Sequence, residues 1–232
     1  MPKRFLITGA TGGLGRAIVG WLDKSDNEFY LVSRKPNKAK ELFGDLKSPH
    51  EILKCDLTHN QEVKDALQSL NDLDVVVNNA GIVSDGLVHK MSFESWNKVL
   101  SLNLTGAFLV TKQVIPKMKK FGHILNISSV LSARGVVGAA NYAASKGGLE
   151  AFTIATAKEL IRKKIFVNVL RLGFYEAGMG LRLPDQVKQS TLERIPLREF
   201  GDPEEVGRAI SWIISSRYLV GQIISLDGGY SI

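Results

Sequence analysis

The feature that most constrains the fold of this chain is a regular alternation of short apolar runs with amphipathic segments. The apolar runs predict strands at Arg4–Thr8, Glu28–Ser33, Glu51–Cys55, Asp74–Val77, Gly122–Ile127, Ile165–Leu170 and Gln222–Leu226. Most are continuously apolar, which is typical of parallel strands covered on both faces. Segments with helical periodicity lie between them, at Gly13–Lys24, Asn37–Phe43, Asn60–Leu70, Ser95–Met118, Tyr142–Lys163 and Pro203–Ser215. Because strand and helix alternate, right-handed crossovers predict an α/β fold with a doubly wound parallel sheet and helices on both faces.

The size and composition of the chain fit a globular protein with a large core. Its 232 residues are 44% hydrophobic and 23% charged, which allows such a core without disulfides or metals. Cys55 is the only cysteine, so no intrachain disulfide can form and a reducing compartment is favoured. We interpret Cys55 as a small buried strand residue rather than a nucleophile, because apolar burial suppresses the thiolate. The basic start of the chain passes directly into strand-like residues, and no apolar run approaches about 20 residues, so we expect a cytoplasmic protein.

The formal net charge is +7, and two interpretations of it stay open. In one, lysines and arginines form a solvated surface that keeps the protein in solution. In the other, they attract an anionic partner, such as a phosphorylated cofactor, an acidic carrier protein or a nucleic acid. The sequence has no stripe of alternating aromatic and basic residues, no zinc-ligand spacing and no helix-turn-helix pattern. Nucleic acid is therefore the least favoured partner, and we predict no metal site.

A glycine-rich segment joins the first predicted strand to the first predicted helix. Residues Thr8–Gly15 read Thr-Gly-Ala-Thr-Gly-Gly-Leu-Gly. Glycines let a backbone turn sharply and approach a pyrophosphate closely, and a helix N-terminus offers free N–H groups to the phosphates. The spacing is neither G-x-G-x-x-G nor that of a Walker A loop, since no Gly-Lys-Ser/Thr follows. We predict a dinucleotide site here, with a merely tight connection as the alternative.

The end of the second predicted strand indicates which dinucleotide binds. A cofactor with a free ribose 2′-hydroxyl usually meets a carboxylate at this point, whereas a 2′-phosphate meets a cation. The strand ends with Ser33, Arg34 and Lys35, which supply a hydroxyl and two positive charges. We therefore predict NADP(H) rather than NAD(H). The alternative is that the two cations are ordinary surface charges.

Tyr142 and Lys146 are four residues apart on a predicted helix, so their side chains share one face. A free tyrosine has a pKa near ~10, and a nearby ammonium lowers it by stabilising the phenolate. Such a pair can act as a general acid, although the spacing alone also arises by chance. Polar residues at Ser128–Ser129 and Asn78–Gly81 end two neighbouring strands, and Asn103 lies on the helix between them. Because ligands bind at the carboxyl edge of such sheets, we expect all of these side chains to line one crevice.

These segments, in this order, resemble the short-chain dehydrogenase/reductase family. The matching pieces span essentially the whole chain: Thr8–Gly15, Asp56, Asn78–Gly81, Asn103, Ile127–Ser129, Tyr142–Lys146 and Asp227–Gly229. The resemblance implies a single NAD(P)-binding Rossmann-type catalytic domain over residues 1–232. It also implies seven strands in the order 3-2-1-4-5-6-7. The Asp227–Gly229 segment resembles one that packs between subunits in this family, which implies a homotetramer.

The resemblance further implies a role for each matching residue. Tyr142 would donate a proton to the substrate carbonyl oxygen as hydride reaches the carbon, and Ser129 would hydrogen-bond the same oxygen. Lys146 would hold the ribose hydroxyls and lower the pKa of the tyrosine, and Asn103 would keep a water in a proton relay to Lys146. The implied cofactor contacts are Gly9, Ala10, Thr11, Gly12, Gly13, Leu14 and Gly15 for the pyrophosphate, Ser33 and Arg34 for the 2′-phosphate, Asp56 and Leu57 for the adenine, Asn79, Ala80 and Gly81 for the adenosine ribose side, and Gly173 and Tyr175 for the nicotinamide.

Three segments, Asn103–Phe108, Ala140–Leu149 and Gly221–Gly229, resemble the bacterial 3-oxoacyl-[acyl-carrier-protein] reductases in particular. That resemblance implies NADPH-dependent reduction of a 3-oxoacyl thioester in fatty acid biosynthesis. Acyl carrier protein is acidic, so a basic rim near the cleft would help it dock. Lys120 and Lys163 occupy positions that are basic and carrier-facing in that group, or else are solvated lysines. The alternatives are another carbonyl reductase or alcohol dehydrogenase of the family, and a non-catalytic dinucleotide-binding regulatory protein.

The chain departs from the family pattern near the expected nicotinamide site. Leu172 precedes Gly173 where the family usually has proline, and Ala177 stands where a threonine commonly bonds the nicotinamide carboxamide. Gly12 replaces the arginine that many NADP-dependent members carry in the glycine-rich turn. The 2′-phosphate would then rest on Ser33 and Arg34 alone.

The segment of residues 173–197 breaks the alternation of strands and helices. It follows a predicted strand and carries glycines, prolines and the apolar residues Leu181, Leu183 and Val187. An insertion at the carboxyl end of a strand is well placed to cover a ligand. We expect it to form a substrate lid, with an irregular loop as the alternative.

Overall fold

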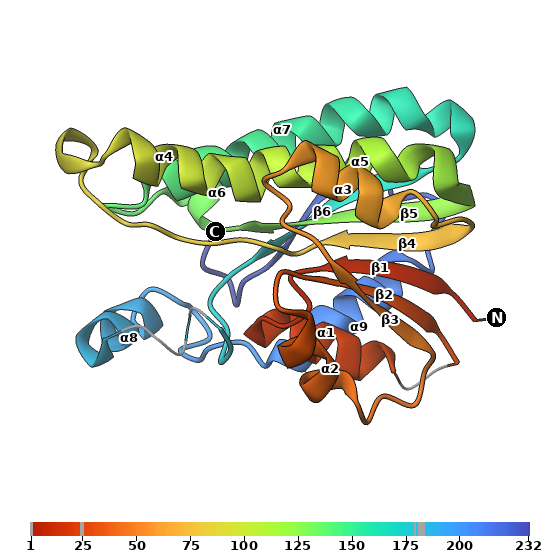
Figure 1. Cartoon of the computed structure of the whole chain (residues 1–232). Coiled ribbons are helices and arrows are strands. Elements are labelled where there is room, and N and C mark those ends of the chain that lie inside the picture. Colours follow the sequence, from red (N-terminus) through yellow and green to blue (C-terminus); the bar gives the residue numbers. More distant parts are fainter. Residues whose placement is uncertain (1, 24–25, 179, 181–183) are drawn as a thin grey trace.

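The computed structural model describes residues 2–23, 26–178, 180 and 184–232, and its strands form one parallel sheet (Figure 1). The sheet has seven strands in the order β3-β2-β1-β4-β5-β6-β7, which confirms the predicted fold. The strands are β1 Arg4–Thr8, β2 Glu28–Ser33, β3 His50–Lys54, β4 Leu73–Asn78, β5 Met118–Ser129, β6 Phe166–Leu172 and β7 Ile223–Leu226. Because every pairing is parallel, all carboxyl ends lie along one edge of the sheet.

Helices cover both faces of the sheet. One face carries α1 Gly13–Leu22, α2 Pro36–Phe43 and α9 Pro203–Ile213, and the other carries α3 Asn60–Leu67, α4 Phe93–Leu100, α5 Ala107–Val114 and α7 Ala140–Leu160 (Figure 1). Shorter elements are η1 Val88–Lys90, η2 Ser101–Gly106, η3 Ile115–Lys117, α6 Leu131–Arg134, η4 Ile161–Lys163 and α8 Asp185–Leu192. The sequence did not predict α6 or α8. The expected helix end at Lys24 lies outside the described residues.

Side chains alternate between two cores, which explains why the strands read as continuous apolar runs. In β1, Phe5 and Ile7 pack with α1, α2 and α9, whereas Leu6 packs with α3, α5 and α7. In β4, Val75 faces the first core and Val76 the second. Each fully buried aliphatic side chain contributes roughly 1.5–3 kcal/mol, so both faces of the sheet hold the layers together.

Cys55 is buried between strand β3 and helix α3, as expected. Burial raises the pKa of its thiol to about 11, and the charges of Glu62 and Asp56 act in the same direction. The thiol therefore stays protonated at neutral pH, which fits a structural residue and not a nucleophile.

The prediction of one regular helix over residues 95–118 was wrong in its details. The helical stretch begins after Ser92, whose Oγ accepts a hydrogen bond from the backbone N–H of Ser95 at 3.1 Å. It widens into the π-helical turn η2, and at Met118 the chain is already in β5. Pro116 lies in the 3-10 turn just before this change, and proline disfavours continuation of a helix.

An 18-residue window within residues 93–117 has a mean hydropathy of 1.2, so this helix is long and apolar enough to cross a membrane by length and composition. Several of its apolar side chains pack inside the protein, among them Val99, Leu109 and Val110, whereas Phe93 and Phe108 are exposed. Packing on the sheet thus accounts for part of the apolar character of this helix. A single helix of this kind is weak evidence for a membrane protein.

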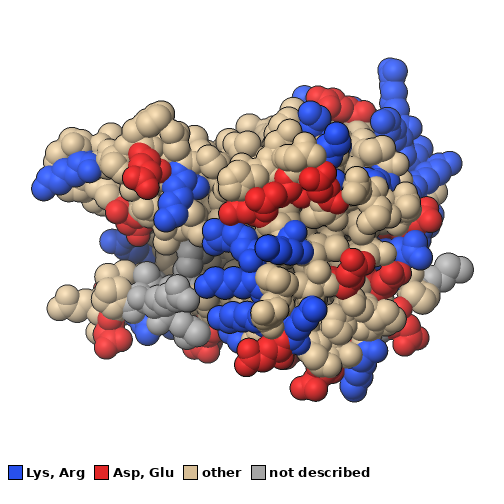
Figure 2. Space-filling model, in the orientation of Figure 1, with Lys and Arg blue, Asp and Glu red and all other residues tan. Residues whose placement is uncertain are grey.

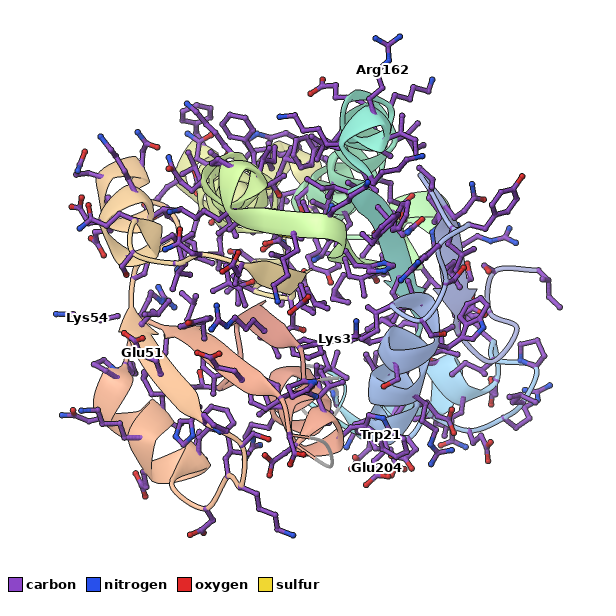
Figure 3. The ribbon with its side chains drawn as sticks, turned by 90° about the vertical axis from the view of Figure 1, so that its right-hand side faces the viewer. Lys3, Trp21, Glu51, Lys54, Arg162 and Glu204 are labelled. Atoms are coloured by element: carbon purple, nitrogen blue, oxygen red, sulfur yellow. The ribbon has the colours of Figure 1, made fainter. Side chains whose placement is uncertain are left out.

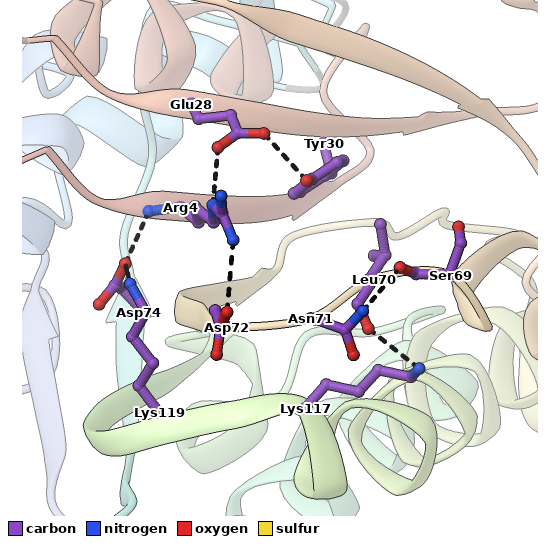
Figure 4. Close-up of polar contacts among 10 residues, drawn as sticks. All are labelled: Arg4, Glu28, Tyr30, Ser69, Leu70, Asn71, Asp72, Asp74, Lys117 and Lys119. Atoms are coloured by element: carbon purple, nitrogen blue, oxygen red, sulfur yellow. Dashed lines mark hydrogen bonds and ion pairs between the residues drawn. The ribbon is translucent and has the colours of Figure 1, made fainter.

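Ion pairs and hydrogen bonds join neighbouring strands at the amino edge of the sheet (Figure 4). Arg4 Nε donates to Glu28 Oε2 at 2.7 Å, which joins β1 to β2. Asp74 accepts from the backbone N–H of Arg4 at 2.9 Å and pairs with Lys119 Nζ at 3.0 Å, which joins β4 to β1 and β5. Charged side chains thus link β1, β2, β4 and β5 at the amino edge. At the opposite, carboxyl edge, uncharged polar residues end β4 and β5.

Candidate active site

The polar residues predicted to gather do so at the carboxyl edge of the sheet. Asn78 ends β4, Ser129 ends β5, and α7 begins close by and carries Tyr142 and Lys146. In the space-filling view a hollow opens at this edge, between the projection that carries α4 and the one that carries α8 (Figure 2). Lys and Arg side chains gather beside the hollow (Figure 2). Its position matches the crevice at strand ends where α/β proteins bind ligands.

Tyr142 is buried in this edge against Val99 and Ala139. Burial raises the pKa of its phenol to about 12; a hydrogen bond with Ser129 opposes the rise and the charge of Asp85 adds to it. The net shift is upward because burial outweighs the other causes, and the lowering of this pKa by Lys146 stays a prediction. The phenol is therefore protonated at neutral pH, which is the form that can donate a proton.

Lys146 is also buried, and its ammonium lies 5.8 Å from the centroid of the Tyr142 ring. Its Nζ donates a hydrogen bond to the Ile127 carbonyl oxygen at 2.7 Å. Burial lowers the pKa of Lys146 to about 8. The negative charge of Glu150 opposes this shift but is the smaller of the two effects. The lysine is thus mostly charged at pH 7 but close to its titration range.

Asn103 lies in η2 and fixes the chain that follows β4. Its Oδ1 accepts from the backbone N–H of Ile82 at 2.9 Å, and its Nδ2 donates to the Ile82 carbonyl at 2.9 Å and to Ser145 Oγ at 3.1 Å. A Cβ added to Gly81 would lie 3.4 Å from Asn103 Oδ1 and 3.5 Å from Lys146 Nζ. The structure therefore brings Asn103, Gly81 and Lys146 together, as the sequence predicts.

The glycine-rich turn is held against the chain that follows β4. Thr8 Oγ1 accepts from the backbone N–H groups of Asn79 and Ala80, both at 3.1 Å. Asn79 Nδ2 donates in return to the carbonyls of Thr8 and Gly9, both at 3.1 Å. Gly9 has φ +65°, and a Cβ there would lie 2.7 Å from Ala80 Cα. A side chain at Gly9 is thus excluded both by backbone strain and by space.

Helix α1 begins within this turn and presents its N-terminus to the crevice side. A Cβ at Gly15 would lie 2.2 Å from the Gly9 carbonyl oxygen. Only glycine therefore fits at this position, where the first turn of the helix packs against the glycine-rich turn. Within the described residues, the N-cap Gly12 offers no side-chain cap and the first turn has no acidic residue. The first backbone N–H groups of α1 are therefore suited to a negatively charged ligand.

The side chains at the ends of β2 and β3 lie together. Arg34 Nη1 is 3.8 Å from Asp56 Oδ2, and 62% of the Arg34 side chain is exposed. Asp56 Oδ1 accepts from the Thr58 backbone N–H at 3.0 Å and from Thr58 Oγ1 at 2.8 Å. Burial acts to raise the pKa of Asp56, but these hydrogen bonds and the Arg34 charge lower it below its ordinary value. Arg34 thus keeps an exposed cation beside an ionised carboxylate.

Two further predicted cofactor contacts in this region are buried side chains. Ser33 accepts a hydrogen bond on Oγ from the Lys35 backbone N–H at 3.1 Å, so its hydroxyl proton can still be donated. Leu57 lies against Gly106, where an added Cβ would come within 3.2 Å of the Leu57 Cβ.

The two predicted nicotinamide contacts, Gly173 and Tyr175, differ in which of their atoms can meet a ligand. A Cβ at Gly173 would lie 2.7 Å from Asp227 Cα, so glycine is needed where the chain after β7 passes the end of β6. Tyr175 turns its ring into the core and donates from its hydroxyl to the Leu226 carbonyl at 2.9 Å. Its backbone, rather than its side chain, is thus the part left for a ligand.

The segment after β6 lies directly over the glycine-rich turn. A Cβ at Gly13 would lie 2.3 Å from the Gly178 backbone nitrogen. Ala177, at the position of the family's threonine, is buried. Leu181 and Leu183 lie outside the described residues, while Val187 is on α8 and exposed. Part of the expected lid is therefore in contact with the predicted pyrophosphate site.

Lys120 and Lys163 lie at the other edge of the sheet. Lys120 precedes Ser129 by nine residues within β5, which corresponds to roughly 30 Å along an extended strand. Lys163 is in η4, beyond α7, and the neighbouring Arg162 projects from this end of the molecule (Figure 3). Within one chain these two lysines therefore lie away from the cleft, and their part in docking a carrier stays a prediction.

Three polar residues next to the site were not predicted from the sequence. Glu150, Arg171 and Ser132 form a hydrogen-bonded group directly behind Ser129. The available signal was the spacing of Glu150, four residues after Lys146 on the same helix. Arg171 lies in a buried strand, where a charge indicates a partner.

Two open hollows flank the segments that follow β4 and β5. One is lined by Val88, Met91, Ser92, Phe93 and Trp96, and the other by Arg134, Gly135, Val136, Val137 and Arg194. The Gly86 backbone N–H donates to the Gly138 carbonyl at 2.8 Å, which links the two segments. Apolar surface is thus exposed near the carboxyl edge of the sheet.

Fold and site together define the class of protein as a Rossmann-type oxidoreductase, and the sequence comparisons identify its family. A family model described as "Enoyl-(Acyl carrier protein) reductase" matches residues 9–231. The chain is 39% identical to the 3-oxoacyl-[acyl-carrier-protein] reductase FabG of Thermotoga maritima, over 99% of this chain and 98% of that protein. It is 36% identical to the protein of the same name from Aquifex aeolicus, over 98% and 96%. It is 34% identical to Nodulation protein G of Rhizobium sp., over 99% and 97%. The chain belongs to the short-chain dehydrogenase/reductase family.

Proposed function

We propose that this chain catalyses the NADPH-dependent reduction of a 3-oxoacyl thioester to the 3-hydroxyacyl thioester in fatty acid biosynthesis. The observation that carries the proposal is the buried group of Ser129, Tyr142 and Lys146 at the carboxyl edge of the sheet. Relatives that are 36% and 39% identical over nearly their whole length bear the name of this reductase.

The residues of the crevice fit a dinucleotide. Gly9–Gly15 supply a backbone turn without side chains at its closest points, followed by a helix N-terminus that no side chain of the described residues caps. We assign the pyrophosphate to this turn, the adenine to Asp56 and Leu57, and the adenosine ribose side to Asn79–Gly81. We assign the nicotinamide to Gly173 and the backbone of Tyr175, and its ribose hydroxyls to Lys146. When bound, the reduced nicotinamide supplies the hydride.

The preference for NADPH rests on Ser33 and Arg34. The Arg34 side chain is exposed, and its nearest carboxylate, on Asp56, already accepts two hydrogen bonds from Thr58. A 2′-phosphate carries more charge than that carboxylate and would form charge-assisted hydrogen bonds with the guanidinium. Ser33 can donate its hydroxyl proton to the same phosphate.

The proton is delivered by Tyr142. Its neutral phenol donates to the carbonyl oxygen while the carbonyl carbon receives hydride, so the C=O group becomes an alcohol. Ser129 donates a hydrogen bond to the same oxygen, which stabilises the negative charge that develops there. The charged Lys146 then stabilises the phenolate, and a water kept near Asn103 completes the relay that returns a proton from solvent.

The surface next to the site favours an acyl substrate over a sugar. Val88 and Phe93 are 74% and 78% exposed, and Val137 is 86% exposed. These residues line the two hollows that flank the segments after β4 and β5. An acyl chain would cover this apolar surface, whereas a sugar would leave it in water.

Steady-state kinetics test the proposal. Acetoacetyl thioesters of acyl carrier protein and of coenzyme A are compared with an enoyl thioester, a sugar and a small secondary alcohol, each with NADPH or NADH. We expect the acetoacetyl thioesters with NADPH to give the highest kcat/KM. A preference for the enoyl thioester would identify a C=C reductase, and a preference for a sugar or alcohol another dehydrogenase; either result contradicts the proposal.

We further propose a cytoplasmic homotetramer that takes its substrate from acyl carrier protein docked near Lys120 and Lys163. Because these lysines lie at the amino edge, a carrier bound there would serve the crevice of a neighbouring subunit. Reversing both charges, with K120E and K163E, should raise KM for the carrier-bound thioester and leave KM for the coenzyme A thioester unchanged. Equal KM changes for both substrates would exclude this docking surface.

A further inference from the structure

A buried carboxylate lies directly behind the catalytic edge. Glu150 Oε1 accepts from Ser128 Oγ at 2.7 Å, from Ser132 Oγ at 2.6 Å and from Arg171 Nε at 2.9 Å. Glu150 Oε2 accepts from Arg171 Nη2 at 2.6 Å. The guanidinium therefore holds the carboxylate with two parallel bonds, an arrangement that fixes its orientation as well as its position.

The pair is withdrawn from solvent. Only 18% of the Arg171 side chain and 10% of the Glu150 side chain are exposed. Burial acts to raise the pKa of Glu150, but the hydrogen bonds from Arg171, Ser132 and Ser128 lower it below its ordinary value. Glu150 is thus an ionised group at neutral pH. A buried ion pair adds little to stability compared with an apolar pair of the same volume, so its presence calls for another explanation.

The Glu150 carboxylate is linked to Ser129 by hydrogen bonds from two neighbouring serines, Ser128 and Ser132. Ser132 Oγ lies 2.7 Å from the Ser129 carbonyl oxygen as well as 2.6 Å from Glu150, and shares its single proton between these two acceptors. Ser128, the residue before Ser129, donates directly to Glu150. One carboxylate therefore holds the side chain of Ser128 and, through Ser132, the carbonyl group of Ser129.

The same carboxylate lies one helical turn after Lys146 on α7. Its negative charge favours the charged form of Lys146. The other charged or titratable groups around this pair are Tyr142 on α7, Asp85 after β4, Arg171 on β6 and Asp227 after β7. Glu150 thus acts on the lysine by charge and on the serine by hydrogen bonds.

We propose that Glu150 and Arg171 form a positioning pair, which fixes Ser129 through Ser128 and Ser132 and supports the ammonium of Lys146. The pair joins α7 to β6, and therefore sets the helix that carries Tyr142 and Lys146 against the strand end that carries Ser129. This inference rests on the proposed carbonyl reduction, but it concerns residues outside the group that touches the substrate.

Three variants test the pair in the full-length protein. Glu150→Gln removes the charge, S132A removes one serine link without leaving a buried charge unpaired, and E150L with R171L replaces the whole pair by apolar side chains. The matched control is Glu28→Gln, which breaks the Arg4–Glu28 pair at the amino edge of the sheet (Figure 4). For each we measure kcat and KM against pH and the midpoint of thermal unfolding.

We expect kcat of Glu150→Gln and of the double variant to fall by about tenfold to hundredfold, since small displacements of catalytic groups have effects of this size. KM for NADPH should change much less. The alkaline limb of the kcat profile should move to lower pH in both, because Lys146 loses its supporting negative charge. S132A should lower kcat without moving that limb, and Glu28→Gln should leave kcat unchanged.

The double variant keeps the proposal testable if Glu150→Gln does not fold, because it leaves no buried charge unpaired. A folded double variant with the wild-type kcat and pH profile would overturn the proposal. If the wild-type protein reduces another carbonyl compound but no acyl thioester, the proposed function fails, and the same variants are compared on that compound. The two failures are therefore distinguishable.

Discussion

The Lys146 ammonium lies 5.8 Å from the centroid of the Tyr142 ring, and both side chains are buried at the carboxyl edge of the sheet. Burial moves their pKa values apart, since it raises that of Tyr142 to about 12 and lowers that of Lys146 to about 8. The phenol is therefore neutral and the lysine largely charged at pH 7. This combination suits proton donation, and so the reductive direction.

The pH dependence of the reduction follows from these two groups. Because the pKa of Lys146 is about 8, the lysine loses its proton as the pH rises through this value. Tyr142 keeps its proton up to a pH of about 12. We expect kcat for reduction, measured with saturating NADPH and substrate, to fall as the pH rises through about 8. A kcat that stays constant up to pH 10 would exclude a role for the charge of Lys146.

Cofactor choice should depend on Arg34. Arg34→Ala removes the exposed guanidinium at the end of β2, and hydrogen bonds to charged groups contribute about 1.5–3 kcal/mol. We therefore expect KM for NADPH to rise by about tenfold or more, since ~1.4 kcal/mol corresponds to a factor of ten. KM for NADH should change little. Arg162→Ala, at the opposite edge (Figure 3), is the control, and equal losses with both cofactors would contradict the assignment.

His123 should make the fold sensitive to acid. Burial, together with the charges of Lys3 and Arg217, lowers the pKa of this imidazole to about 4. The unfolded chain takes up a proton near pH 6.5 but the folded chain does not, so stability is complete above 6.5 and declines as the pH falls toward 4. The shift corresponds to on the order of 3 kcal/mol at pH 4.

Chemical unfolding between pH 4 and 7 measures this effect. In His123→Leu the titrating group is gone, and the side chain still packs beside Phe166, whose ring centroid lies 5.2 Å from that of the imidazole. The free energy of unfolding of this variant should depend less on pH over this range. The same slope in both proteins would show that other groups cause the acid sensitivity.

Much of the fold and of the site could be predicted because it depends on local pattern. Residues such as Phe5, Leu6 and Ile7 are apolar in succession because both faces of β1 are covered, and this pattern gives parallel strands directly. Parallel strands bring their carboxyl ends to one edge, so Asn78 at the end of β4 and Ser129 at the end of β5 lie at the same edge of the sheet.

The parts that could not be predicted depend on packing between distant segments. Glu150 and Arg171 are 21 residues apart and meet only when α7 lies on β6. The raised pKa of Tyr142 comes from burial against Val99 and Ala139, which no spacing reveals. Tyr175 matched a cofactor position in the family pattern, but its ring fills the core because Gly201 leaves room for it.

The most direct test of the proposed function is the rate of acetoacetyl thioester reduction by Tyr142→Phe with NADPH. The substitution removes the proton donor and keeps the shape of the ring, so kcat should fall by about a hundredfold to ten-thousandfold while the Kd for NADPH stays the same. A rate equal to that of the wild-type protein would contradict the mechanism. A wild-type protein that binds NADPH and reduces no carbonyl compound would instead identify a dinucleotide-binding regulatory protein.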